Sequence, residues 1–247
     1  MAEGDGRRAL EAPLMSWWSA ESRGGSRSLR TRRSLLLAAA SEIDAAGYHG
    51  ASLRTILESA QLTKGALYFH FTSKEDLARA VVVEAMSSWR EVVDAVRRLG
   101  LDPLWSQIVE VDASVGRRMY DPPARAAGRI IAATDMFDGL RGEWMAAWSA
   151  DTAASMTRAA EVGVLRHEVE PEHLARSVMA LTSGHFVLAD LYPGAGDYFC
   201  RMNDMWEGLL PVVTTPRWFD DFTRSGWLSR PAPELGSYVD ARSPERG

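Results

Sequence analysis

The chain is poor in cysteine and in lysine. Cys200 is the single cysteine among 247 residues. An internal disulfide and a zinc site built from cysteines are therefore excluded, and a reducing cytoplasm is the simplest compartment. Lysine occurs only at Lys64 and Lys74, against 26 arginines. Both lysines lie in one short stretch, from Thr63 to Leu77, which is the most informative part of the sequence.

Long apolar runs are also missing. No segment approaches the ~20 consecutive apolar residues of a membrane span, and the N-terminus is too polar for a secretory signal. Hydrophobic residues still make up 46% of the chain, which is enough for a core at this length. We expect a soluble, cytoplasmic protein that does not contact a membrane.

The histidines form no pattern typical of catalysis or metal binding. His167, Glu168 and His173 lack the His-Glu-x-x-His spacing that places two imidazoles on one helical face. Ser183-Gly184-His185 lacks a nucleophile elbow. An enzyme is the first alternative class considered, and these patterns give it no support. We expect no cofactor and no metal.

The formal net charge of -5 is divided unevenly along the chain. Residues 1–76 carry 10 Lys and Arg against 9 Asp and Glu, whereas the remainder carries 18 against 24. A nearly neutral head on an acidic body can bind phosphates locally without adhering to nucleic acid everywhere.

Apolar residues recur at helical spacing along most of the chain, and no alternating strand pattern competes. The first helix begins near Leu29, and Gly47 is placed for a left-handed C-terminal cap. Ser52 can cap a second helix and Thr63 a third, with only Gln61 and Leu62 between them. Two short helices joined so tightly predict a helix-turn-helix, with the second as the reading helix. Further helices are predicted over residues 74–98, 104–120, 123–137, 141–162, 171–191 and 197–210.

Two stretches, Gly47 to Ile56 and Thr63 to Leu77, together resemble the TetR family of one-component bacterial repressors. The resemblance implies an all-α, TetR-like dimer with a three-helix DNA-binding head and a C-terminal helical domain for ligand binding and dimerisation. We place a disordered arm at residues 1–27, the head at 28–76, the ligand-binding and dimerisation domain at 77–215 and a tail at 216–247.

The body resembles one branch of this family, the gamma-butyrolactone autoregulator receptors and pseudo-receptors of Streptomyces and its relatives. The matching pieces include Trp148, the run from Ala159 to Leu165, Gly184-His185 and the run from Met205 to Pro211. This implies a repressor that binds a palindromic operator as a homodimer and is released by a butyrolactone-like or furan-type signal, controlling antibiotic or other secondary-metabolite genes. The alternative is a pseudo-receptor that responds to an antibiotic, another apolar metabolite or a partner protein. Activation instead of repression also stays open.

The family resemblance assigns the DNA contacts to the capped stretch around the two lysines. Lys64 can donate to a guanine edge or a phosphate, and Ala66 can touch a thymine methyl. Leu67, Phe69 and Phe71 are expected to pack the head instead. The candidate contacts are Ser52, Arg54, Thr63, Lys64, Gly65, Ala66, Tyr68, His70 and, as a phosphate clamp, Lys74.

The same resemblance places a ligand pocket around Trp148, a broad apolar wall. Related receptors often carry a polar group on the helix that holds Ile131 and Thr134, and Ile131 cannot supply one. This departure favours a bulkier or more apolar effector. The alternative is that the tryptophans simply fill the core. The candidate ligand residues are Trp148, Trp144, Met86, Trp89, Ile131 and Thr134.

Broad apolar stripes on the last two helices predict the dimer interface. The stripe on the first of these helices consists of Leu174, Val178, Leu181, His185 and Leu188, and the stripe on the second consists of Met202, Met205, Trp206, Leu209 and Leu210. Two such helices from each chain would form a four-helix interface, which sets the two reading helices about one DNA turn, ~34 Å, apart. An ordinary intramolecular core is the alternative.

The base-reading assignment of Lys64 is testable. Lys64→Ala is expected to weaken operator binding more than binding to random DNA, because a base contact carries sequence information and a phosphate contact does not. Gel-shift titrations on both DNAs measure the two affinities. An equal loss on both would make Lys64 a phosphate clamp.

Overall fold

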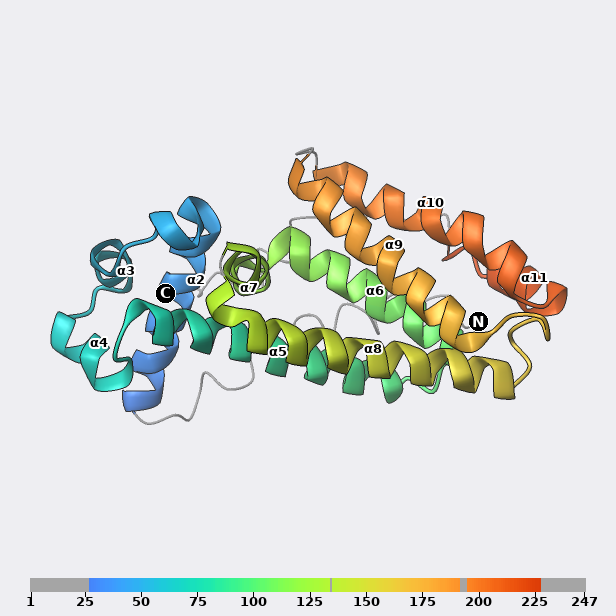
Figure 1. Ribbon diagram of the computed structural model, residues 1–247, viewed down its shortest axis with the longest axis horizontal. Coiled ribbons are helices and arrows are strands. Elements are labelled where there is room, and N and C mark those ends of the chain that lie inside the picture. Colours follow the sequence, from blue (N-terminus) through green and yellow to red (C-terminus); the bar gives the residue numbers. More distant parts are fainter. Residues whose placement is uncertain (1–26, 134, 192–194, 228–247) are drawn as a thin grey trace, which may run out of the picture. The chain divides into compact units, whose positions relative to one another are not determined.

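The computed structural model describes residues 27–133, 135–191 and 195–227, and the regular secondary structure in these ranges is helical apart from one isolated bridge between Leu165 and Thr214. Figure 1 shows the helices. The chain divides into two compact units. We call residues 27–94 and 117–145 the head unit, and residues 95–116 and 146–227 the body unit, within the described ranges. None of the described helices is long and apolar enough to cross a membrane.

Local signals in the sequence account for the helices of the head unit. Ser52 caps α3 by accepting from the Thr55 N–H at 3.1 Å, and Thr63 caps α4 by accepting from the Ala66 N–H at 3.2 Å. Gly47 has a φ of 73°, which interrupts α2 where the cap was predicted. The head helices are α2 (Arg27–Gly50), α3 (Leu53–Ala60), α4 (Lys64–His70), α5 (Lys74–Arg97), α7 (Pro122–Ala133), the short η2 (Asp135–Phe137) and the start of α8 (Asp138–Glu161).

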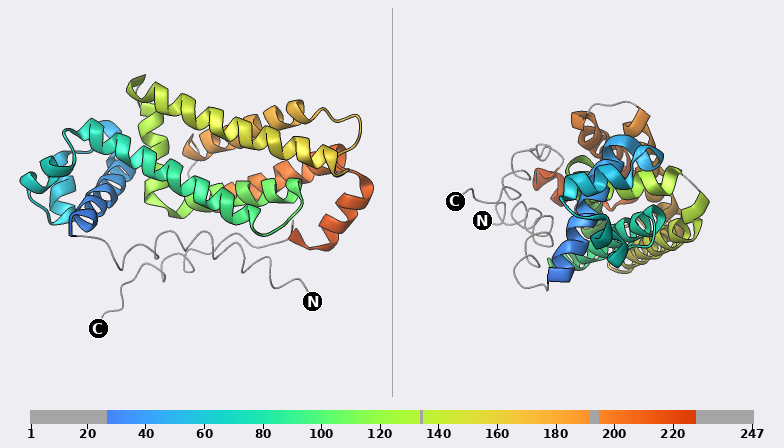
Figure 2. Two further views of the ribbon diagram at one scale, coloured as in Figure 1. Left: turned by 90° about the horizontal axis from the view of Figure 1, so that it is seen from below. Right: turned by 90° about the vertical axis from the view of Figure 1, so that its left-hand side faces the viewer.

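The core of the head unit extends well beyond the three N-terminal helices. The buried face of α5, beginning at Leu77, packs in one hydrophobic cluster with α2. Helix α7 packs against α2 (Figures 1 and 2), where Arg125 forms a bidentate ion pair with Asp44, the shortest N–O distance being 2.7 Å. The domain boundary that we placed at residue 76 therefore does not separate two compact units, because α5 is continuous and shares this core.

The body unit consists of α6 (Pro103–Tyr120) up to residue 116, most of α8, α9 (Pro171–Leu191), α10 (Ala195–Val213) and α11 (Pro216–Arg224). Helices α9 and α10 lie side by side (Figure 1). Val178 and Trp206 on the predicted stripes are buried, whereas Leu181 and Leu188 are exposed. The stripes thus contribute both to the intramolecular core and to a free apolar face.

The segment after Pro216, which we assigned to a tail, begins with a helix. Residues 216–224 form α11, whose Phe222 is completely buried. The Trp105 ring lies edge-on to Phe222 at 5.2 Å, and Trp218 donates from Nε1 to Asp102 Oδ2 at 3.1 Å. Aromatic burial therefore holds this segment on the body, while residues 228–247 lie outside the described ranges.

The body unit buries the carboxyl group of Glu110 near other charged groups. Glu110 on α6 is 5% exposed. Burial raises its pKa to about 7, the Arg97 charge opposes this rise, and Asp151 adds to it. Arg97 itself forms an ion pair with Asp151 at 2.8 Å.

This burial predicts a pH-dependent stability. The pKa of Glu110 is about 7 in the folded chain against an ordinary 4.5, so its contribution is present at acid pH and is lost as the pH rises through 7. A shift of this size corresponds to a loss on the order of 3 kcal/mol. Between pH 5 and 8 the Tm of the wild type should fall relative to that of Glu110→Gln, which stays neutral. The exposed Glu161→Gln serves as control and should follow the wild type; parallel curves for all three proteins would contradict the assignment.

Candidate nucleic-acid interface and effector site

The reading helix α4 is oriented by two buried residues. Leu67 is completely buried and Phe71 is 3% exposed. Because they are four residues apart, they mark one side of the helix and leave the other side free. Lys64 and Gly65 at its start are exposed, Tyr68 is 50% exposed, and Ala66 and His70 are half-buried.

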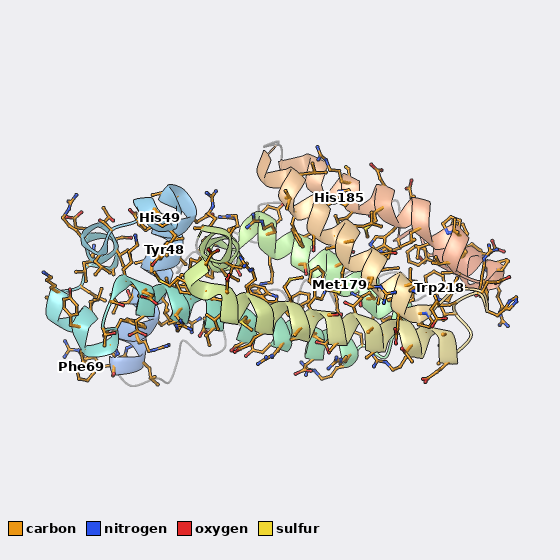
Figure 3. The ribbon with its side chains drawn as sticks, in the orientation of Figure 1. Tyr48, His49, Phe69, Met179, His185 and Trp218 are labelled. Carbon is orange, nitrogen blue, oxygen red and sulfur yellow. The ribbon has the colours of Figure 1, made fainter. Side chains whose placement is uncertain are left out.

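Phe69 is 77% exposed, so the expectation that it packs the head is wrong. It lies two positions from both Leu67 and Phe71, which puts it about 200° around the helix from them. Its ring contacts only that of His70 among the described aromatic pairs, at 5.0 Å (Figure 3). The i,i+4 spacing of Leu67 and Phe71 in the sequence could have indicated that Phe69 lies on the opposite, exposed side of the helix.

Gly65 has no role in the packing of the head. A Cβ at this position would meet only Thr63 Oγ1, at 3.9 Å, and its φ is not positive. Nothing within the head therefore demands glycine at this position.

Most of the remaining predicted DNA contacts already form a hydrogen bond or an ion pair within the head. The hydroxyls of Ser52 and Thr63 accept the capping bonds of α3 and α4. Arg54 is exposed and pairs with Glu58 at 3.0 Å, an i,i+4 surface pair that contributes little to stability. Lys74 is half-buried at the first turn of α5, where its Nζ donates to the His49 carbonyl at 3.4 Å.

The predicted ligand residues fall into both units. Met86, Trp89, Ile131 and Trp144 belong to the head unit. Met86 lies in its hydrophobic cluster, and Ile131 and Trp144 pack against that cluster half-buried. Met86, Ile131 and Trp144 thus contribute to the head core. Trp148 is half-buried in the body unit, and Thr134 lies outside the described residues.

The body unit holds buried polar atoms that sequence reasoning missed. Gln107 Oε1, Thr152 Oγ1 and Thr182 Oγ1 form no hydrogen bond in the described part of the chain, and each of these residues is 1% exposed. A buried polar atom left without a partner costs roughly 1–3 kcal/mol, so such groups need an explanation. They come from α6, α8 and α9, and polar residues at core positions of predicted helices were the available signal. Among the described residues no group of His, Cys, Asp or Glu could hold a metal ion.

Comparison with known proteins identifies the head. The model of the family described as bacterial regulatory proteins, tetR family, matches residues 35–81. The A-factor receptor protein of Streptomyces griseus is 30% identical over 192 residues, which are 77% of this chain. The chain belongs to the TetR family. It spans 66% of the length of the A-factor receptor.

Solved structures confirm the TetR fold over most of the chain. A structure described as the molecular basis for control of antibiotic production by bacterial hormones is 29% identical, with a TM-score of 0.66, and covers 76% of this chain and all of that one. TylP, a TetR regulator from Streptomyces fradiae, is 27% identical with a TM-score of 0.61, covering 87% of this chain and all of TylP. These relatives are described as a receptor and a TetR regulator, and the chain shares with them the helix-turn-helix head that the tetR family model matches.

The exposure of Phe69 generates a prediction for this TetR head. Phe69→Ala is expected to lower operator affinity roughly three- to tenfold, because an exposed aromatic ring on a reading helix can pack on a thymine methyl or the sugar-phosphate backbone. Stability should change by less than about 0.5 kcal/mol, since the ring is free of the core. Fluorescence anisotropy with labelled operator measures the affinity.

A matched control is Val83→Ala, which also trims an exposed apolar side chain, but on α5, nine residues beyond Lys74. It should bind the operator like the wild type. Equal affinities for Phe69→Ala and Val83→Ala would remove Phe69 from the interface.

Proposed function

We propose that this TetR regulator is a repressor that binds a palindromic operator as a homodimer and is released by a small signalling molecule. The effector is of the gamma-butyrolactone or furan type or another largely apolar metabolite, and the regulated genes serve antibiotic or other secondary metabolism. Homology to the A-factor receptor supports this reading. The observation that carries it is the set of buried, unpartnered polar atoms in the body unit.

The DNA contacts proposed are the exposed groups of the helix-turn-helix. Lys64, Tyr68 and Phe69 lie on the open side of α4, and Gly65 leaves room for the DNA backbone. Arg54 adds a cation on α3. Direct base reading is assigned to the start of α4, and phosphate contacts to Tyr68, His70, Lys74 and the cap residues Ser52 and Thr63.

The effector contacts proposed lie in the body unit. Trp148 supplies an apolar wall, and Gln107, Thr152 and Thr182 supply an amide oxygen and two hydroxyls. A lactone or furan with an alkyl tail matches this combination, because its ring oxygens can accept from hydroxyls while its tail contacts apolar walls. Hydrogen bonds to the effector's head therefore come from α8 and α9, which compensates for the apolar Ile131.

The homodimer proposal is supported by an exposed apolar face on α9 and α10. Leu181, Gly184 and Leu188 follow one side of α9, and Gly208 and Val212 follow one side of α10, all of them exposed. Leucines beside glycines let two helix pairs approach closely around a two-fold axis. A dimer then presents two reading helices to the two half-sites of a palindrome.

The orphan hydroxyls give a sharp test of the effector site. In the absence of effector, Thr152→Val and Thr182→Val should keep operator binding and raise or preserve the Tm, because an apolar group replaces an unpartnered polar one. Each should require about tenfold more effector for release, the equivalent of removing one hydrogen bond. The measurement is a gel shift of the full-length protein on the DNA upstream of its own gene, titrated with extract of the producing culture.

Thr157→Val is the matched control on α8, where the hydroxyl is exposed and donates to the Ala153 carbonyl at 3.0 Å. It should be released like the wild type. Wild-type release of all three variants would contradict the assigned effector contacts. Failure to bind any inverted repeat upstream of its own gene would contradict the autoregulatory picture itself.

A further inference from the structure

The turn at the end of α2 holds the Lys74 side chain. Besides donating to the His49 carbonyl at 3.4 Å, the ammonium lies 4.8 Å from the centroid of the Tyr48 ring. Tyr48 is only 8% exposed, so the surrounding core restricts the position of its ring. Figure 3 labels Tyr48 and His49, at the end of α2. Neither was singled out as a functional residue from the sequence.

Residues of α7 and η2 also contact the turn at the end of α2. The Tyr48 ring meets Phe137 edge to face, with centroids 5.7 Å apart and planes at 89°. His49 donates from Nε2 to the carbonyl of Ala133, the last residue of α7, at 3.2 Å. Phe137 is 1% exposed, so the contact is part of the head core. Tyr48 and His49 thus lie between Lys74 and the segment that joins α7 to α8.

The groups around Lys74 fix its position without neutralising it. An ammonium has three N–H donors, and the His49 carbonyl takes one of them. The ring of Tyr48 attracts the cation through its π face. In the described part of the chain no carboxylate forms an ion pair with Lys74, in contrast to Arg54, whose charge Glu58 already faces. Two donors and the full charge are left for an anion.

Burial also acts on the protonation of this group. It lowers the pKa of Lys74 from its ordinary value, because a half-buried ammonium loses part of its hydration. A phosphate restores favourable surroundings for the charge. An anionic partner at Lys74 therefore replaces part of the hydration that its ammonium has lost.

We propose that Tyr48 is a positioning residue, which holds the Lys74 ammonium where it meets an operator phosphate, and that Phe137 makes this contact depend on the α7–η2 segment. The proposal rests on the proposed function, since it assumes operator binding by the head. A displacement of α7 would then change the affinity for operator DNA by moving the Tyr48 ring. This route acts in addition to any movement of α5.

The salt dependence of operator binding tests the role of Tyr48. Removing one phosphate contact reduces the slope of log K against log salt by about 0.9. Tyr48→Leu removes the π face and should lower this slope by about 0.9 per protomer, as Lys74→Ala does. Tyr48→Phe preserves the ring and should retain the wild-type slope. The double variant Tyr48→Leu, Lys74→Ala should show no further decrease; an unchanged slope in a folded Tyr48→Leu protein would overturn the proposal.

A second measurement needs no DNA and uses the scarcity of lysine. With only Lys64 and Lys74 in the chain, lysine-labelled protein gives two sets of side-chain NMR signals. The ring current of Tyr48 should shift the Lys74 Hε signals upfield, while the exposed Lys64 keeps the values of a free side chain. Tyr48→Leu should abolish the shift and Tyr48→Phe should preserve it.

The contribution of Phe137 is tested in the same spectra. Phe137→Leu removes the edge contact and should reduce the Lys74 shift, whereas the neighbouring exposed Met136→Leu should not. Wild-type Lys74 signals at the Lys64 values would overturn the proposal even if the operator is bound. Shifted Lys74 signals in a protein that binds no operator would instead contradict the proposed function.

Discussion

The burial of Leu67 and Phe71 orients α4, the second helix of the helix-turn-helix. Helix α4 has seven residues, too few to be stable as an isolated helix in water, so its existence depends on packing. Once these two side chains enter the head core, the opposite face turns outward. The exposure of Lys64, Tyr68 and Phe69 is a direct consequence of that packing.

The core that receives α4 is shared with α7 and the start of α8. Arg125 on α7 forms a bidentate ion pair with Asp44 on α2. The Phe137 ring contacts the Tyr48 ring edge to face. The DNA-binding helices and the α7–η2 segment therefore form one packed unit, in which a discrete displacement of one element must be accommodated by the others. A ligand uses such a connection only through different affinities for two arrangements of the protein.

The body unit combines a hydrophobic core with polar atoms that the core does not satisfy. Gln107, Thr152 and Thr182 are as deeply buried as the core residue Leu104, yet their side-chain oxygens have no hydrogen-bond partner in the described part of the chain. A fold selected only for stability would replace them with apolar side chains of similar shape. Their presence supports the proposed function, in which the body binds an effector with complementary polar atoms.

What the sequence determined by itself was local. The caps at Ser52 and Thr63, the positive φ of Gly47 and the helical periods are properties of contiguous residues, so the helix-turn-helix and most helix bounds were predicted correctly. Tertiary structure alone decided which side chains meet. It turned Phe69 outward, packed Ile131 and Trp144 against the head core, and buried Phe222 of the supposed tail. It also brought Tyr48 between Lys74 and Phe137, because contacts between distant helices depend on the packing of the whole core and leave no periodic trace in any one segment.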